Sequence, residues 1–518
     1  MRSNQQNVWR KRTGDNLLAM IFIKNRIVSA CILALITNVG LGCSASLGRV
    51  NGTPAVSASP SVPWIAPKNA IKAEPIVSPL AASVVPADLT DRIQKLTLSD
   101  VVDLALRNNP ATRASWAQAR AAADVLGSAR GDYFPELNAS ITGSRTKSPA
   151  TAGRTGGLRT EYGPSLSLNY LLFDFGGRSG GIESARQNLF AADLTHNATL
   201  QNVVLNAESA FFDYSATAAL LAAERSAIAE GEANLKSAEQ RNKVGLATIA
   251  DVLQAKTALS QEQLNLETIQ GNLQAARGSL ASALGLPANL PFDLEPLPPA
   301  IPVGAIAQSV DSVINDALRN RPDLAAARSQ AAAAVARVRV ARSAELPSLS
   351  LGSNVGRTYS RPPLFSGPSY GINLGISIPL FNGLSRSYDV GAARAQADAV
   401  SALADQTRQN VINQVFVSYY ALQTAQQRVV TADDLLVSAQ QSAQVAAGRY
   451  REGVGSITDL LTAQSALANA RAQQVQSRWQ WYTALAQLAR DAGVLGSRGE
   501  TPFSFTTDAA TKLPVINP

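Results

Sequence analysis

The sequence is poor in the residues that usually carry catalysis and metal binding. Its 518 residues include one histidine, His196, and two cysteines, Cys31 and Cys43. A single histidine cannot build a histidine-rich metal site, and any histidine-based triad would depend on His196 alone. Two cysteines form neither a disulfide framework nor a four-thiolate zinc site. With 16% charged and 6% aromatic residues, we expect a structural protein that catalyses no reaction and binds no cofactor or metal.

The net charge of +8 lies mostly at the N-terminus. Residues 1–42 contain six basic residues and one acidic residue, a net charge of +5, so that the rest of the chain carries only +3. No stretch interleaves basic and aromatic side chains, and nucleic acid is therefore not an expected partner.

The N-terminal 42 residues have the order of a secretory signal peptide: a basic segment, a short apolar run at residues 27–36, and small residues. Leu41-Gly42-Cys43 resembles the lipobox of bacterial lipoproteins, although Gly40 stands where that motif usually has leucine, and Cys43 is the predicted lipidation site. Ordinary cleavage near Ala45 is the alternative. Residues 43–90, rich in Ser, Pro and Ala, are predicted to form an extended tether. No later segment has eighteen uninterrupted apolar residues, so a membrane crossing would require β-strands.

The rest of the chain contains an internal duplication. Arg107-Asn-Asn-Pro110 returns 212 residues later as Arg319-Asn-Arg-Pro322, and the segment Arg241–Asp251 returns 208 residues later as Arg449–Asp459. The predicted repeats are residues 91–290 and 307–495, joined by a proline-rich linker at 291–306 and followed by a C-terminal tail at 496–518.

Each repeat is predicted to alternate long helices with a pair of strands. Thr97–Asp100 is a capping-box pattern that opens a helix running to about Gly131. Residues 182–244 and 388–452 contain no proline, so each predicts a helix of roughly 90 Å. Second helical arms are expected at about residues 249–284 and 457–490. His196 lies in a polar stretch and is expected to face solvent.

Strand-like alternation follows Pro135 and Pro347. Apolar residues recur at every second position over four segments, with small polar residues between them. One such face is expected at Ile372, Leu374, Ile376, Ile378 and Leu380. The alternation fits membrane strands around a wet interior, although strands of a β-sandwich would show the same pattern. Five arginines are placed in the two strand–strand loops: Arg145, Arg154, Arg159, Arg357 and Arg361.

These features together resemble the TolC family of outer-membrane efflux proteins of Gram-negative bacteria. The resemblance covers about residues 96–495. It is carried by the duplicated helix–strand–strand–helix unit, the Asn-Pro and Arg-Pro helix starts, the strand ends near Phe173 and Phe381, and the turns at 244–251 and 453–459. It implies a homotrimer in the outer membrane, extending into the periplasm, with a long periplasmic α-helical barrel and a 12-stranded β-barrel to which each chain gives four strands. Independently, four strands are too few to close a pore, and open edges are not tolerated in lipid.

The implied function is a passive exit duct of a tripartite efflux pump or type I secretion system, recruited by a periplasmic adaptor and an inner-membrane pump. A lipid-anchored periplasmic coiled-coil scaffold without a pore is the alternative. The resemblance places adaptor contacts at two matching sets, Arg241, Gly245 and Leu246, and Arg449, Gly453 and Val454. It places a periplasmic constriction at Asp459 and Tyr450, with Asp251 as a latch acceptor.

The sequence departs from the family pattern at two positions near the expected constriction, and the residues of the turns also have a simpler, purely structural explanation. Gly455 and Thr462 stand where the family pattern has a latching arginine and a second aspartate. Gly245 and Gly453 also suit the left-handed position that ends a helix, and Asp251 and Asp459 complete capping boxes, so these residues could serve the turns alone. Aromatic residues at the strand ends are expected in an interfacial girdle or in ordinary packing (Phe173, Phe175, Phe381). Those near the end of the last helix are expected to pack (Trp479, Trp481, Tyr482).

Overall fold

The computed structural model describes residues 49–50, 53–54, 95–147, 157–295, 305–306, 308–361, 366–495 and 505–506. The predicted signal peptide, Cys43, most of the tether, Arg154 and most of the tail lie outside these residues. The chain divides into residues 1–78 and 79–518. In the first unit, strand β1 (Arg49–Val50) pairs antiparallel with β2 (Thr53–Pro54). In the second unit, β5 (Ala305–Ile306) pairs antiparallel with β8 (Phe505–Thr506).

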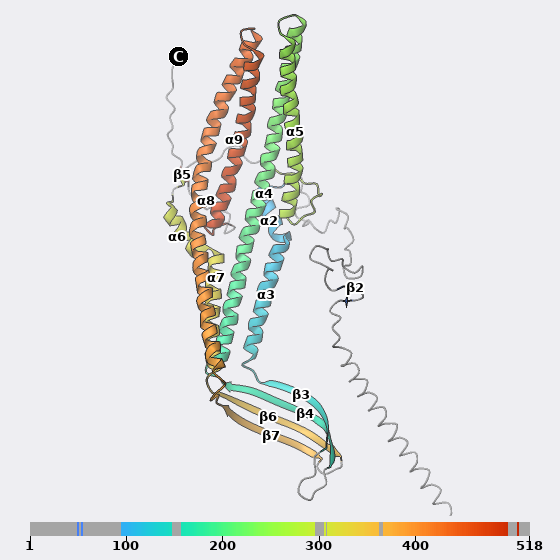
Figure 1. The fold of residues 1–518 in the computed structure, drawn as a ribbon, viewed down its shortest axis with the longest axis vertical. Coiled ribbons are helices and arrows are strands. Elements are labelled where there is room, and N and C mark those ends of the chain that lie inside the picture. Colours follow the sequence, from blue (N-terminus) through green and yellow to red (C-terminus); the bar gives the residue numbers. More distant parts are fainter. Residues whose placement is uncertain are drawn as a thin grey trace, which may run out of the picture. The chain divides into compact units, whose positions relative to one another are not determined.

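The second unit confirms the predicted duplication (Figure 1). The first copy consists of α2 (Leu98–Asn108), α3 (Pro110–Gly131), β3 (Glu136–Lys147), β4 (Leu158–Phe173), α4 (Gly177–Lys243) and α5 (Ile249–Ala283). The second consists of α6 (Val310–Asn320), α7 (Pro322–Ser343), β6 (Ser348–Arg361), β7 (Gly367–Ser377), α8 (Ser385–Arg451) and α9 (Ile457–Asp491). Among the helices of the described residues, none has both the length and the apolar character needed to cross a membrane.

The single helix expected from Thr97 to about Gly131 is wrong, because the chain breaks at Asn109. The capping box at Thr97 and Asp100 is present as predicted. Asn109, which precedes Pro110, has φ −63° and ψ 127°, since proline disfavours helical geometry in the residue before it. The Asn109 side chain accepts a hydrogen bond from the N–H of Ala111 and so caps α3. The same break recurs at Arg321, between α6 and α7.

The four long strands form one antiparallel sheet in the order β3-β4-β6-β7 (Figure 1). Paired residues carry the alternation across the whole sheet: Ala139, Leu166, Val355 and Tyr370 lie in one row. The neighbouring row has Asn138, Ser167, Asn354 and Gly371. The sheet therefore has one apolar face and one small-polar face, and β3 and β7 are its two edges within the described residues.

The strands differ from the sequence prediction at both ends. β7 stops at Ser377, so Ile378 and Leu380 lie beyond it, because Pro379 has no N–H to extend the ladder. Four arginines expected in loops lie inside strands instead: Arg145 in β3, Arg159 in β4, and Arg357 and Arg361 in β6. At these positions the strands stay paired beyond the last alternating apolar residues, from which the strand ends were predicted.

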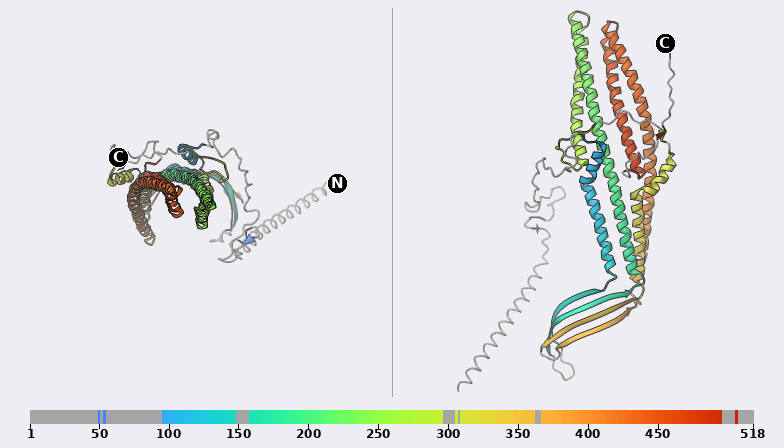
Figure 2. Two further views of the ribbon diagram at one scale, coloured as in Figure 1. Left: turned by 90° about the horizontal axis from the view of Figure 1, so that it is seen from above. Right: turned by 180° about the vertical axis from the view of Figure 1, so that it is seen from behind.

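The long helices α4 and α8 have 67 residues each, about 100 Å at 1.5 Å per residue. Each forms a hairpin with the helix that follows it, α5 and α9 respectively, and α7 packs between α4 and α8. Seen from above in Figure 2, the two hairpins lie side by side along an arc. At the ends away from the turns, one core gathers Leu104, Phe211 and Leu280, and a second gathers Val313, Leu422 and Trp481.

Several individual residues follow from this packing. Trp481 is 1% exposed, and Trp479 and Tyr482 pack against Phe212, so their predicted packing role is confirmed. His196 is not simply solvent-facing, since its Nδ1 lies 2.8 Å from the Ser115 hydroxyl of α3 in a half-buried site.

Candidate functional site

The candidate site is the pair of turns that end the two helical hairpins. After α4, Gly245 has φ +78°, and the N–H of Leu246 donates to the carbonyl of Arg241 at 2.8 Å. After α8, Gly453 has φ +80°, and the N–H of Val454 donates to the carbonyl of Arg449 at 3.0 Å. A left-handed glycine with this backbone bond is the usual end of an α-helix. The local prediction for both glycines is confirmed.

The aspartates of the turns close the capping boxes that open α5 and α9. Asp251 accepts from the N–H of Thr248 at 2.7 Å, and Asp459 accepts from the N–H of Ser456 at 3.4 Å. In return, the hydroxyls of Thr248 and Ser456 accept from the N–H groups of the aspartates. Asp251 is half-buried and Asp459 is exposed. Both carboxylates therefore stabilise helix starts within the chain, and the Asp459 carboxylate also remains accessible.

Arg241 joins the two turns. Its Nη1 donates to the carbonyls of Tyr450 at 2.9 Å and Arg451 at 3.3 Å, the last carbonyls of α8. Its Cζ lies 4.9 Å from the centre of the Tyr450 ring. A cation at the C-terminus of a helix is favoured by the helix dipole and by the unpaired carbonyls there. Arg241 thus holds the first hairpin to the second, a contact between residues 209 positions apart.

Tyr450, predicted at the constriction, is only 5% exposed and packs with Ile457 and Leu460. Its hydroxyl is buried and has no hydrogen-bond partner among the described residues. Burial raises the pKa of Tyr450; the Arg241 cation opposes this rise and the Asp251 carboxylate adds to it. The structure therefore brings Arg241, Tyr450 and Asp251 together, and the Asp459 side chain is exposed.

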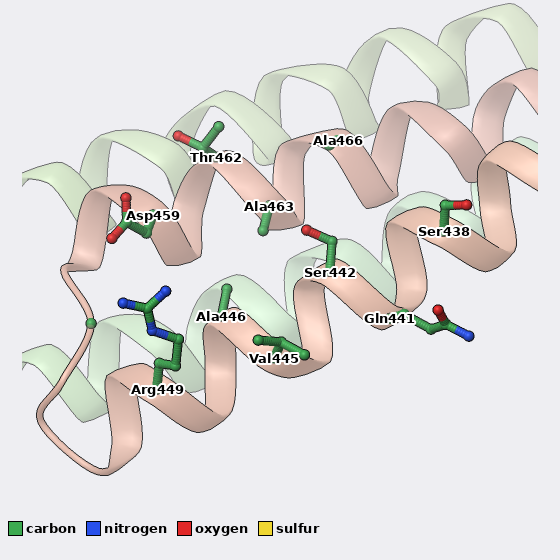
Figure 3. A pocket seen from close by; sticks show the side chains of 11 residues that line it. Ser438, Gln441, Ser442, Val445, Ala446, Arg449, Asp459, Thr462, Ala463 and Ala466 are labelled. Carbon is green, nitrogen blue, oxygen red and sulfur yellow. The ribbon is translucent and has the colours of Figure 1, made fainter. Parts of the chain in front are cut away.

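Arg449 and Asp459 lie on opposite walls of an open groove of about 640 Å³ between α8 and α9. Figure 3 shows the Arg449 side chain reaching toward Asp459, with Ser438 and Ser442 farther along α8. Gly455 and Thr462, the two departures from the family pattern, also line this groove.

The tips of both turns are apolar and exposed. Leu246 is 69% exposed and Val454 is 68% exposed. These side chains have little to pack against within one chain, because each turn is only a few residues long. Gly245, Gly453 and Arg449 of the predicted adaptor set are exposed as well.

The sequence did not reveal two glutamates of α4, Glu208 and Glu224, whose pKa values are raised in the structure. Burial raises the pKa of Glu208 in α4 to about 7. Burial, together with a hydrogen bond and the charge of Glu262, raises the pKa of Glu224 to about 7. No local signal marks these residues, because the shift depends on which helices cover them.

The comparisons with known proteins identify the family. Residues 101–286 and 313–494 match the outer membrane efflux protein family. The chain belongs to this family. Protein CyaE of Bordetella pertussis is 31% identical over 411 residues, which cover 78% of this chain and 86% of CyaE. The probable efflux pump outer membrane protein TtgC of Pseudomonas putida is 27% identical over 397 residues, 75% of this chain and 80% of TtgC.

Solved structures agree on the fold. The outer-membrane channel OprN has a TM-score of 0.67 at 24% identity, covering 76% of this chain and 89% of that structure. The CmeC outer membrane channel of Campylobacter jejuni has a TM-score of 0.68 at 20% identity, covering 78% and 87%. The chain is therefore an outer-membrane channel protein of the efflux family, as its repeats and turns predicted. Family membership favours the duct over the scaffold without a pore.

Proposed function

We propose that three copies of this chain close into one passive exit duct, with a 12-stranded β-barrel and a helical barrel in the periplasm. The sheet order β3-β4-β6-β7 carries the proposal. Its two edges would leave unpaired backbone groups in lipid, where each costs several kcal/mol. Four strands cannot close on themselves, since single barrels begin at eight, so strands from several chains must be pooled. A channel of this kind performs no chemistry, and the energy for transport comes from its partners.

The test is the protein mass of the detergent-solubilised particle, measured by light scattering with the detergent subtracted. Three chain masses are expected, together with conductance when the particle is added to a planar lipid bilayer. A monomer that stays soluble without detergent would contradict the duct and favour the scaffold.

The partners we propose are a periplasmic adaptor and an inner-membrane pump. Relatives named as efflux pump outer membrane proteins support this assignment. The adaptor surface consists of the two turn tips, Gly245 and Leu246 with Gly453 and Val454, and has Arg241 and Arg449 at its rim. The exposed leucine and valine supply the apolar contact area that such an interface needs.

Charged side chains at the two turn tips should prevent the adaptor from binding to the duct. The double variant Leu246→Asp, Val454→Asp is expected to abolish export by the assembled pump, because two carboxylates would have to be desolvated in the interface. Dye retention in cells measures export, and the amount of channel in the outer membrane must stay unchanged. Val125→Asp is the matched control, since Val125 is also exposed, at 59%, and lies on α3, far along the chain from the turns. Full export by the double variant would contradict the adaptor surface.

The constriction we propose comprises Asp459 and Tyr450, with Asp251 beside Tyr450. Three exposed Asp459 carboxylates around one axis would favour cations over anions. In planar bilayers, Asp459→Asn is therefore expected to lower the cation preference, whereas Asp124→Asn, an exposed change on α3, is expected to leave it unchanged. Equal selectivity of Asp459→Asn and the unmodified channel would remove Asp459 from the constriction.

At the N-terminus, we propose that residues 1–42 are removed and that Cys43 is acylated. The mass of the mature N-terminal peptide tests this directly. A peptide that begins near Ala45 without acyl chains would establish ordinary cleavage instead.

A further inference from the structure

The register of the sheet assigns the charged residues of its strands to different faces. Counted from Ala139, Leu166 and Val355 of the apolar face, every second residue lies on that face. Glu136 and Glu161, the two acidic residues of the four strands, fall on the small-polar face. Four cations fall on the apolar face instead: Arg145, Lys147, Arg357 and Arg361. The apolar face therefore carries positive charge and no negative charge.

These four cations differ from the arginine on the opposite face. Arg159 lies on the small-polar face and forms an ion pair with Glu161. The four cations are all exposed, and none of them has an ion-pair partner within the described residues. The two segments that join the strands, residues 148–157 and 362–366, contain no acidic residue. The positive charge is therefore not balanced by the strands or by the segments between them.

The cations lie near the end of the sheet that is farthest from the helices (Figure 1). Arg145, Thr160 and Arg361 form one row across three strands, and Lys147 lies two residues farther along β3. Because neighbouring strands are about 4.8 Å apart, the backbones of Arg145 and Arg361 are separated by about 10 Å. Two arginine side chains at this separation can reach one headgroup between them.

A row of tyrosines separates this row of arginines from the apolar rows. Tyr162 pairs with Tyr359, and the centres of their stacked rings are 5.4 Å apart. Arg357 lies one row nearer the helices, but its Cζ is 5.5 Å from the centre of the Tyr359 ring. Its cation therefore reaches toward the tyrosine row, as long basic side chains do when their backbone lies in an apolar layer. Aromatic rows of this kind mark the membrane interface in outer-membrane barrels.

The spacing of the rows matches the layers of a membrane. The rows from Leu349 to Tyr359 of β6 cover about 34 Å of strand. At a strand tilt of about 45°, this length spans about 24 Å of membrane thickness, close to the apolar band of about 25 Å in such barrels. Arg145 and Arg361 lie one row beyond the tyrosines, and therefore at the depth of the lipid headgroups.

We propose that Arg145 and Arg361 bind a phosphate of a glycolipid headgroup in the outer leaflet of the outer membrane. The proposal rests on the duct proposed above, in which the apolar face meets lipid and the helices lie in the periplasm. The two guanidinium groups donate paired N–H groups to phosphate oxygens, whose geometry they match. Lys147 adds a third cation, and the acyl chains of the lipid lie along the apolar rows. The row of Leu349 and Ile376, at the helix end of this face, has no charged residue, so the site distinguishes the two leaflets.

Binding of diphosphoryl lipid A to the detergent-solubilised full chain tests the site, with the bound lipid counted by native mass spectrometry. The double variant Arg145→Gln, Arg361→Gln is expected to weaken binding roughly 25-fold, about fivefold for each cation removed. The matched control is Arg113→Gln, Arg225→Gln, which removes the same charge from exposed positions of α3 and α4 and is expected to keep the affinity. Lipid A without its phosphates should bind the unmodified channel more weakly, and inorganic phosphate should not displace lipid A.

Four results would overturn the site. The first is equal affinity of the double variant and the control. The second is equal binding of lipid A with and without its phosphates, since the acyl chains alone would then account for it. The third is displacement of lipid A by inorganic phosphate, which would make the arginines a site for the free ion. The fourth is a protein of the cell that copurifies through these two arginines while the double variant binds lipid A unchanged.

Failure of the lipid site can be told apart from failure of the duct. A trimer by light scattering whose lipid A affinity is the same in the double variant overturns the lipid site and leaves the duct standing. A chain that stays soluble without detergent overturns both. The row of Arg145 and Arg361 lies within one chain, so its lipid binding can be measured whichever number of chains the detergent-solubilised particle contains.

A milder change keeps the proposal testable if the double variant does not reach the membrane. Lys147→Gln changes the last residue of β3, where a neutral polar side chain suits the strand end, and should weaken lipid A binding roughly fivefold. Arg159→Gln, on the opposite face of the same sheet, is the control and is expected to keep the affinity. Equal affinities for these two variants would refute a headgroup site on the apolar face.

Discussion

Removing the carboxylate of Asp491 is expected to destabilise the junction between the end of α9 and the break between α6 and α7. Arg321 is 4% exposed, and its Nη1 lies 3.7 Å from Oδ1 of Asp491. The same carboxylate accepts from Arg490 at 2.9 Å and from Gln487 at 3.0 Å. Asp323 is the other carboxylate that bonds Arg321.

The expected cost of Asp491→Ala follows from burial. Removing one partner of a buried ion pair costs about 3–5 kcal/mol, because the remaining charge stays desolvated. Asp323 still neutralises Arg321, so we expect a loss of about 3 kcal/mol, the low end of that range. The control is Asp316→Ala, which breaks the exposed Arg319–Asp316 pair at 3.4 Å and is expected to cost less than about 1 kcal/mol.

The assay is urea unfolding of the detergent-solubilised protein, followed by circular dichroism of the helices. Asp491→Ala should unfold at clearly lower urea than Asp316→Ala. Equal midpoints would refute the reasoning.

The pH dependence of the same network has a defined sign. Burial tends to raise the pKa of Asp323, but the hydrogen bond and charge of Arg321 outweigh burial, and the pKa is lowered. A lowered pKa contributes stability above the ordinary aspartate range, which is lost as the pH falls through the lowered value. Asp323→Asn should therefore flatten the acid side of the stability curve.

Three further predictions concern single positions. Burial raises the pKa of Glu208 to about 7, so the stability that its protonated form contributes is present below the ordinary glutamate range and is lost as the pH rises through 7. Glu208→Gln should therefore unfold at higher urea than the unmodified protein at pH 8 but not at pH 4. Equal unfolding curves at pH 8 would contradict this. Gly493→Ala should cost about 1–2 kcal/mol in urea unfolding, because φ is +76° and the new methyl would lie 2.9 Å from backbone, whereas Gly271→Ala, with open space in a helix, should gain about 0.5–1 kcal/mol; a matched loss at both positions would argue against backbone strain. Trp481→Ala should cost about 3–5 kcal/mol because the ring is fully buried, and a loss no larger than that of Trp116→Ala, an exposed position, would count against the packing assigned to it.

The local structure of the turns could be predicted from a few adjacent residues. Gly245 and Gly453 end helices because only glycine adopts positive φ without strain, and Thr248 and Ser456 open the next helices through bonds that span three residues. The duplication was equally visible, since a repeat is a property of the order of residues. From these two features, the helix–strand–strand–helix plan and the family resemblance followed.

Contacts between distant residues were decided by the tertiary structure. The bond from Arg241 to the end of α8 joins positions 209 residues apart, and His196 meets Ser115 across 81 residues. Neither pair has a local pattern, because each depends on how one copy of the unit lies against the other. The strand ends also differed from the prediction, since a ladder can continue through polar residues while its partner strand continues.

The physical reason is the range of the forces involved. Caps, turns and periodicity are settled by groups within one helical turn or one strand pair, and the order of residues therefore determined the elements and their repetition. Burial, the pKa of Glu208, the ion network at Asp491 and the open groove at Ser442 depend on which helices come to cover a position. Only the packed structure of the chain decided those.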